Sequence, residues 1–243
     1  MAIKNGTSAS ETLTGTDLED SLFGLAGDDG LNGLKGNDTL DGGLGADKLN
    51  GGFGNNTYTF GKGDGNDLID SYSDTTLGKL NTVQFKAGVS VSDVVAYRSG
   101  ADLVLKISGT DSITAENYFY LETPSNSYNP LQQVKFNDGA VWDINAINTK
   151  AFSGTSGNDI IKGTSGNDIF NVSAGNDAIN GGLGNNTYFL GKGGGNDFLT
   201  SYKDTTAYDG TVFGKLNTLQ FKADVAVADV AAVRSGNNLV LTI

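Results

Sequence analysis

The chain of 243 residues contains no cysteine and no histidine. The first absence excludes disulfides and thiolate metal sites, and the second removes the commonest general base and the commonest ligand of transition metals. Carboxylate and carbonyl oxygens remain as metal ligands, and these suit hard cations such as Ca²⁺. No catalytic residue is assigned, because no histidine is present to activate a serine, and "GTSG" at 154–157 and 163–166 matches neither a hydrolase elbow nor a P-loop.

Positive charge and long apolar runs are also scarce. The chain has 16 Lys and Arg against 28 Asp and Glu, which gives a formal net charge of −12. This balance argues against nucleic acid, whose binders need a basic surface, and against anionic membranes unless a cation mediates. No stretch has the length of a transmembrane segment, and the N-terminus "MAIKNGTSAS" lacks the pattern of a cleavable signal peptide.

Proline is equally rare, with 2 residues, whereas glycine is abundant, with 36. From Gly6 to Thr59 the chain divides into six consecutive repeats of nine residues, for example "GLAGDDGLN" and "GLKGNDTLD", and every repeat begins with glycine. The sixth position is acidic or an amide, and the eighth is Leu or Tyr. A second array starts at Gly154, and each array gains one more repeat after a two-residue insertion.

A nine-residue unit of this kind predicts a six-residue turn followed by a three-residue strand whose central side chain points inward. Two units then make one coil of a right-handed parallel solenoid, and each turn stacks on the turn two repeats later. The gap between stacked turns is lined by carbonyls and position-six carboxylates, which suits Ca²⁺. One apolar side chain per nine residues offsets little of the entropy lost on ordering, so metal binding is expected to be coupled to folding.

The nonapeptides match the pattern G-G-x-G-x-D-x-U-x, and the chain therefore resembles the RTX, or haemolysin-type, calcium-binding repeat proteins, which form a parallel β-roll. The resemblance implies several Ca²⁺ ions, each held by carbonyls and position-six side chains from two turns. It implies the pairs Asp20–Asp38, Asp29–Asp47, Asp38–Asn56, Asp47–Asp67, Asp159–Asp177, Asp168–Asn186 and Asp177–Asp197. It also implies carbonyl ligands at Gly27, Gly33, Gly36, Gly42, Gly45, Gly51, Gly157, Gly166, Gly175 and Gly181. Glu11 and the two asparagines depart from the pattern and predict weaker or absent sites.

The segments after the arrays differ in kind. Short β-branched and aromatic runs, such as "TVQF", "VVAYR", "LVLKI" and "VKFNDGAVW", predict antiparallel strands, and only "VSVSDVVAY" shows a weak helical period. Residues 61–150 resemble the haemolysin-type calcium-binding-related domain. Residues 61–76 match 191–206 at 11 of 16 positions, and 78–100 match 214–236 at 17 of 23.

We therefore predict an all-β chain in which parallel β-roll arrays alternate with small antiparallel β-domains. The predicted segments are a first array at 1–60, a β-domain at 61–150, a second array at 151–200 and an incomplete second copy of the β-domain at 201–243. This incomplete copy suggests a fragment cut inside a module. Asp64, Asp70, Asp74 and Asp204 lie off the repeat phase and are expected in turns or at the surface.

The resemblance implies a secreted bacterial protein, extracellular or on the cell surface, that is exported by type I secretion machinery and folds in calcium. The predicted role is a non-enzymatic folding module of a toxin, adhesin or surface-layer protein. Two alternatives stay open: a module that binds polysaccharide or a cell-surface glycan, and the tail of a secreted lipase or protease. The aromatic residues at 117–120, Tyr128 and Trp142 suit a sugar platform, but are expected to fill the core of the β-domain. Paired carboxylates also suit a glycosidase, but metal ligation already explains each pair.

Overall fold

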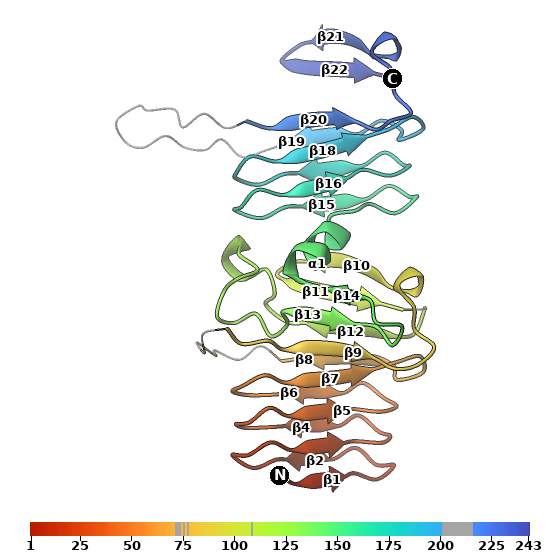
Figure 1. Ribbon diagram of the computed structural model, residues 1–243. Coiled ribbons are helices and arrows are strands. Elements are labelled where there is room, and N and C mark those ends of the chain that lie inside the picture. Colours follow the sequence, from red (N-terminus) through yellow and green to blue (C-terminus); the bar gives the residue numbers. More distant parts are fainter. Residues whose placement is uncertain (71–73, 75, 77, 108, 201–215) are drawn as a thin grey trace, which may run out of the picture. The chain divides into compact units, whose positions relative to one another are not determined.

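The computed structural model describes residues 1–70, 74, 76, 78–107, 109–200 and 216–243. The chain forms two compact units, Met1–Ala151 and Phe152–Ile243 (Figure 1). The described residues are mostly strands and turns, with one α-helix, α1 (Ile144–Ala151), and three short 3₁₀ helices, η1 (Val91–Asp93), η2 (Tyr120–Glu122) and η3 (Val227–Asp229). The chain is thus all-β, as predicted.

The first repeats form two facing ladders of parallel strands. The strands are β1 (Ile3–Asn5), β2 (Thr12–Thr14), β3 (Ser21–Phe23), β4 (Gly30–Asn32), β5 (Thr39–Asp41), β6 (Lys48–Asn50), β7 (Thr57–Phe60) and β8 (Asn66–Ile69). Odd-numbered strands pair in one sheet and even-numbered strands in the other. Leu22 lies opposite Leu40, and Leu31 lies opposite Leu49. Every strand therefore pairs with the strand two repeats on, which confirms the predicted parallel β-roll.

The position-eight side chains form a single column between the two sheets. Each strand contributes its central residue to this column, because alternate side chains of a strand point to opposite faces. The column is at most 2% exposed at Leu22, Leu31, Leu40, Leu49, Tyr58 and Ile69. The core of the array is consequently one side chain wide.

Residues 61–151 extend both sheets of the array. β9 (Thr82–Phe85) pairs in parallel with β7, and β13 (Gln133–Lys135) follows in parallel and then pairs with β14 (Val141–Trp142). On the other sheet β12 (Ser112–Ala115) pairs in parallel with β8, and antiparallel β11 (Asp102–Lys106) and β10 (Val95–Ser99) follow. The predicted antiparallel pairing is found for β10, β11 and β12 and for β13 with β14, but it is wrong for "TVQF", because β9 pairs in parallel with β7 and with β13. These strands share the sheets of the roll because the last strands of the array offer open edges. The predicted division at residue 60 stays a prediction.

The helix α1 was not expected from the sequence. It begins after Asp143, whose Oδ1 accepts the backbone N–H of Ala146 at 2.8 Å, and it buries Ile147 and Ala151. The weak helical period of 89–97 instead yields η1 and β10. The expected aromatic core is confirmed for Tyr118, Phe119 and Trp142, which are buried, whereas Tyr120 and Tyr128 are about 40% exposed.

The second unit repeats the roll on a smaller scale. One sheet contains β15 (Ile160–Lys162), β17 (Ala178–Asn180) and β19 (Phe198–Thr200), and the other β16 (Ile169–Asn171), β18 (Thr187–Leu190) and β20 (Thr218–Phe221). Ile161, Phe170, Ile179 and Tyr188 form its buried column. β21 (Ala231–Ser235) and β22 (Asn238–Thr242) make a separate antiparallel hairpin.

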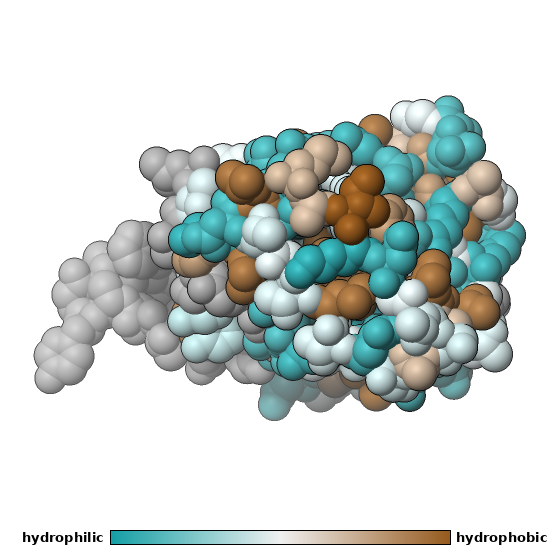
Figure 2. Space-filling view, turned by 90° about the horizontal axis from the view of Figure 1, so that it is seen from below, coloured by the Kyte–Doolittle hydropathy of each residue, from teal (hydrophilic) through white to brown (hydrophobic). Residues whose placement is uncertain are grey.

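The surface is mixed in polarity. On the face shown in Figure 2, apolar residues lie scattered among hydrophilic ones. Among the described residues, no helix is long and apolar enough to cross a membrane.

Candidate metal centres

The turns of the array bring backbone groups of successive coils close together. Gly27, Gly36 and Gly45, at position four, have φ between 102° and 145°, a conformation that favours glycine. The N–H of Gly27 donates to the carbonyl of Leu44 at 2.9 Å, and that of Gly45 to the carbonyl of Asp64 at 2.8 Å. Each turn is therefore bonded to the turn two repeats later.

The position-six side chains form one column along each edge of the roll. The backbone N–H of Asp20 donates to Oδ1 of Asp38 at 2.8 Å, and that of Asp29 donates to Oδ1 of Asp47 at 2.7 Å. The same bond joins Asp38 to Asn56, Asp47 to Asp67, Asp159 to Asp177, Asp168 to Asn186 and Asp177 to Asp197. The structure thus brings together every side-chain pair that the sequence predicted.

The second carboxylate oxygen distinguishes the sites. Among the described position-six residues, Oδ2 is buried without a hydrogen-bond partner at Asp29, Asp38, Asp47, Asp67 and Asp177, and the same holds for Asp74 outside the repeats. A buried anionic oxygen without a partner is strongly unfavourable, so these positions need a counter-charge.

Carbonyl oxygens of later turns lie close to position-six carboxylates. A Cβ on Gly33 would lie 2.7 Å from the carbonyl oxygen of Gly51 and would also collide with Oδ2 of Asp38. A Cβ on Gly163 would lie 2.7 Å from Oδ2 of Asp168 and 2.8 Å from the carbonyl oxygen of Gly181. The first glycine of each of these two repeats thus leaves a space where the carboxylate of its own repeat meets a carbonyl from a later turn. This donor set consists of hard oxygens only and fits Ca²⁺.

Other position-six carboxylates are satisfied by a threonine at position two. Thr16 donates its Oγ1–H to Oδ2 of Asp20 at 2.8 Å, and Thr164 donates to Oδ1 of Asp168 at 2.8 Å. Thr155 makes the same bond with Asp159 at 3.0 Å. These turns therefore have less need of an added cation than the five sites above.

The side-chain amides of the two position-six asparagines bond carbonyls of their own turns. Asn186 Nδ2 donates to the carbonyl oxygens of Gly181 at 2.7 Å and Leu183 at 3.0 Å, and Asn56 Nδ2 donates to that of Gly52 at 3.3 Å. Each amide thus bonds carbonyls that would otherwise face a cation. The ligand role of every position-six residue and glycine named above stays a prediction.

Burial sets the electrostatics of the column. Desolvation raises the pKa of Asp38 to about 6, and the charges of Asp20 and Glu19 add to the rise. Desolvation likewise raises the pKa of Asp67 to about 8, with Asp47 and Asp64 nearby, and raises the pKa of Asp47. The cause in each case is a carboxylate held away from water among other carboxylates.

The column continues beyond the residues that the sequence reading identified. The N–H of Asn56 donates to Oδ1 of Asn81 at 2.8 Å, and the N–H of Asn81 donates to Oε1 of Gln132 at 2.8 Å. In the second unit Asn186 bonds Asn217 in the same way, at 3.0 Å. Asn81 and Gln132 stand two residues before the buried strand residues Val83 and Val134, a signal that was present in the sequence outside the nonapeptide phase.

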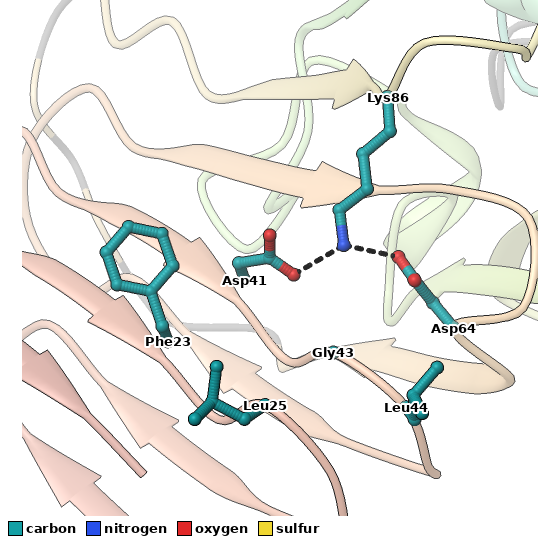
Figure 3. Close-up of a pocket in the computed structure, with 7 residues that line it drawn as sticks. All are labelled: Phe23, Leu25, Asp41, Gly43, Leu44, Asp64 and Lys86. Atoms are coloured by element: carbon teal, nitrogen blue, oxygen red, sulfur yellow. Dashed lines mark hydrogen bonds and ion pairs between the residues drawn. The ribbon is translucent and has the colours of Figure 1, made fainter.

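A shallow cavity of about 220 Å³ lies beside one edge of the roll (Figure 3). Lys86 Nζ lies between two carboxylates there, 2.7 Å from Oδ1 of Asp41 and 2.9 Å from Oδ2 of Asp64. Phe23, Leu25 and Leu44 form its apolar rim.

The off-phase aspartates differ from the expectation in part. Asp64 and Asp74 are buried, and Asp70 pairs with Lys48 at 3.2 Å, whereas Asp204 lies outside the described residues. Asp64 is buried because Lys86 supplies its counter-charge. No group of three or more carboxylate side chains forms a metal cluster within the part of the chain that the structure describes. A metal site that combines two position-six side chains with backbone carbonyls stays a prediction.

Comparison with known proteins matches the same segments. The family model of the "RTX calcium-binding nonapeptide repeat (4 copies)" matches residues 5–40, 31–58 and 153–188. The model of the "Haemolysin-type calcium binding protein related domain" matches residues 102–146.

A curated relative is the "Iron-regulated protein FrpA" of Neisseria meningitidis serogroup C, 33% identical over 104 residues. The match covers 42% of this chain and 9% of that protein. Among solved structures, the AlgE6R3 subunit of the Azotobacter vinelandii mannuronan C5-epimerase is 24% identical in sequence. The match covers 45% of this chain and 71% of that chain, with a TM-score of 0.30. The extracellular lipase LipA of Serratia marcescens is 14% identical, with 96% and 35% covered and a TM-score of 0.23.

Proposed function

This chain carries the calcium-binding nonapeptide repeats of the RTX proteins, and we propose that its turns hold Ca²⁺ ions whose binding drives the folding of the arrays. The observation that carries the proposal is the set of buried carboxylate oxygens without a partner, at Asp29, Asp38, Asp47, Asp67 and Asp177. Bound calcium would supply the positive charge and the coordination that these oxygens need. The carboxylates and the glycine carbonyls of two successive turns would hold it.

The sites are expected to differ in strength. Turns with an unpartnered Oδ2 gain most from a cation, because the cost of the buried charge is then relieved. Turns with a threonine bond, as at Asp20 and Asp168, gain less. The gaps that the side-chain amides of Asn56 and Asn186 themselves occupy gain least. Binding free energy of this kind adds directly to folding free energy.

The proposed biological role is that of a structural module without chemistry of its own. The family resemblance supports a protein that leaves the cell through type I secretion machinery and folds outside, where calcium is plentiful. A sequence with net charge −12 is poorly ordered until cations neutralise it, which suits passage through a secretion channel in an unfolded state.

A calcium titration followed by circular dichroism tests the proposal. The chain should gain β-structure with Ca²⁺ but not with Mg²⁺, which demands a tighter octahedral shell, and a chelator should reverse the gain. Asp47→Asn keeps an oxygen for the bond from the N–H of Asp29 but removes the charge, and should raise the midpoint calcium concentration by about tenfold. Asp17→Asn is the matched control, since its side chain is 62% exposed.

The proposal fails if the chain is equally ordered in excess chelator near pH 8, where the carboxylates are ionised. It also fails if Asp47→Asn and Asp17→Asn shift the midpoint alike, because a general charge effect then explains both.

A glycan-binding role has one observation in its favour. The rings of Tyr120 and Tyr128 are half-exposed and meet edge to face with their centroids 5.2 Å apart. A glycan array with and without calcium, repeated on Tyr128→Ala, tests this role, and equal signals for both chains would exclude this pair as the platform. The role as a lipase or protease tail stays a prediction that the flanking sequence would decide.

A further inference from the structure

Four turns of the two rolls begin on an Asn–Gly peptide bond. In each case the glycine is the first residue of a nonapeptide, and the asparagine before it is the last residue of a strand. These bonds are Asn5–Gly6, Asn32–Gly33, Asn50–Gly51 and Asn180–Gly181. In an unfolded chain this dipeptide deamidates readily, because glycine has no Cβ to hinder the attack of its backbone nitrogen on the asparagine amide.

Packing requires the glycine of each of these bonds. A Cβ on Gly33 would collide with Oδ2 of Asp38 and would lie 2.7 Å from the carbonyl oxygen of Gly51. A Cβ on Gly181 would collide with the hydroxyl of Tyr188. The roll therefore cannot replace these glycines with a bulkier residue that would protect the asparagine.

In the folded roll, the nitrogen that would attack is hydrogen-bonded to a later coil. The N–H of Gly33 donates to the carbonyl of Asn50 at 2.8 Å. The N–H of Gly181 donates to the carbonyl of Thr200 at 2.9 Å. The nitrogen attacks only after it loses its proton, and a bond to a neighbouring coil opposes that loss because the proton is what the carbonyl accepts.

The asparagine side chain is restrained as well. Oδ1 of Asn180 accepts the N–H of Gly182 at 3.0 Å, and Oδ1 of Asn50 accepts the N–H of Gly52 at 3.0 Å. Such a turn fixes the side chain against its own backbone two residues on. Both reacting groups are thus held by contacts that exist while the turn is folded.

We propose that the four Asn–Gly bonds are deamidation sites that the stacked coils protect, and that a chain left without calcium is modified there into a form that no longer folds. The second part rests on the calcium-dependent folding proposed above. In the reaction the glycine nitrogen bonds to Cγ of the asparagine, the Cγ–Nδ2 bond breaks, and the amide nitrogen leaves as ammonia with the glycine proton. Water then opens the resulting succinimide to aspartate, or to isoaspartate when it adds at the main-chain carbonyl.

Isoaspartate would displace the turn, because the backbone then runs through the side-chain carbon and gains one atom. At Asn50 this atom precedes Gly51, whose carbonyl oxygen lies in the gap beside Asp38. At Asn180 it precedes Gly181, whose carbonyl oxygen lies beside Asp168. The extra atom shifts these carbonyls and the register of the strand that follows, so the modified chain should regain less β-structure in calcium.

Ageing of the full chain at neutral pH and body temperature tests the proposal. One sample contains calcium, one contains chelator, and one contains calcium with concentrated urea. Each is digested, and aspartate and isoaspartate are measured by mass spectrometry and by enzymatic methylation of isoaspartate. Asn171 is the internal control, because it also ends a strand at the ninth position but precedes Val172, whose branched side chain hinders the attack.

The Asn–Gly bonds should be modified at least about tenfold faster in urea than in calcium, because the reaction follows the population of opened chain. The chelated sample should follow the urea sample, and Asn171 should stay intact in all three.

Calcium is then added back to the chelated sample, and circular dichroism measures the recovery. The aged chain should regain less β-structure than a fresh one. The control is a chain in which serine replaces the four asparagines, since a serine hydroxyl also accepts the N–H of the turn but has no amide to lose. Its substitutions are Asn5→Ser, Asn32→Ser, Asn50→Ser and Asn180→Ser, and its recovery should not change with ageing.

Equal modification in calcium and in urea would overturn the inference, since the coils would then protect nothing. Modification of Asn171 at the rate of the Asn–Gly bonds would also overturn it, as would full recovery of a chain whose four bonds are modified. Protection in chelator together with modification in urea would show that the roll folds without calcium. That result would refute calcium-dependent folding and the second part of the inference, while protection by the coils would stand.

Discussion

The calcium-free chain should lose stability as the pH rises from about 4 to about 8. Asp67 carries the largest part of this effect, because burial among other carboxylates raises its pKa to about 8. A carboxyl whose pKa is higher in the folded state binds its proton more tightly there, so its contribution to stability is complete at low pH. That contribution is lost as the pH rises through the folded pKa. Asp38, with a pKa of about 6, acts in the same direction over the lower part of the range.

The magnitude for Asp67 follows from the size of the shift. A rise from 3.8 to about 8, at about 1.4 kcal/mol per unit, amounts to at most about 6 kcal/mol of unfolding free energy. This is comparable to the whole stability of a small domain, so the calcium-free first array should be markedly less stable near pH 8 than near pH 4. Calcium binding displaces the proton, and saturating calcium should therefore remove most of the pH dependence.

Urea unfolding in chelator at pH 4, 6 and 8, followed by circular dichroism, measures the effect. The Asp67→Asn chain is the control, since its amide does not titrate and should flatten the upper half of the curve. Proton release on calcium addition at pH 7 gives an independent measure. A calcium-free stability that increases with pH, or an Asp67→Asn curve parallel to that of the unsubstituted chain, would refute the reasoning.

Three further substitutions test the turns and the cavity. Gly175→Ala should destabilise the second array by about 2–3 kcal/mol, because Gly175 has φ 126° and an added Cβ would collide with the carbonyl of Gly157. Gly157→Ala is the control and should change little, because an added Cβ there would have no atom nearer than 3.7 Å. The urea midpoints of the two variants measure the difference. Lys86→Met should lower the free energy of unfolding by about 2–3 kcal/mol, because it leaves the two carboxylates of the cavity without a counter-charge. Lys222→Met loses one hydrogen bond to a carbonyl and should lower it by about 1 kcal/mol. Equal losses in the two variants would contradict a stabilising role of the ion pairs. Asn56→Asp should raise the number of bound calcium ions by one in isothermal titration calorimetry, and an unchanged stoichiometry would show that the amide is not what closes that turn.

The contrast between the two units shows how strongly sheet edges shape this fold. Leu103 and Val104 of the "LVL" run in β11 are buried, whereas Leu239 and Val240 of the identical run in β22 are exposed. In the first unit β12 lies beside this run, with Ala115 opposite Leu103, and the local sequence decides only that the residues form a strand.

The sequence alone was sufficient for the roll. Its period of nine places one inward side chain and one position-six carboxylate in each coil, and such local periodicity determines both the buried column from Leu22 to Ile69 and the pairing of Asp29 with Asp47. The strand at 82–85 was also readable, because its β-branched and aromatic composition is local.

The tertiary structure decided the features that depend on distant parts of the chain. The parallel insertion of β12 next to β8, the helix α1 and the burial of Asp64 beside Lys86 each join residues from separate segments. The threonine bonds that satisfy Asp20 and Asp168, and the unpartnered oxygen of Asp47, also appear only when the turns are stacked. The physical reason is that repeat spacing determines which groups face the gap, whereas the partner of each group is set by the coil that packs against it.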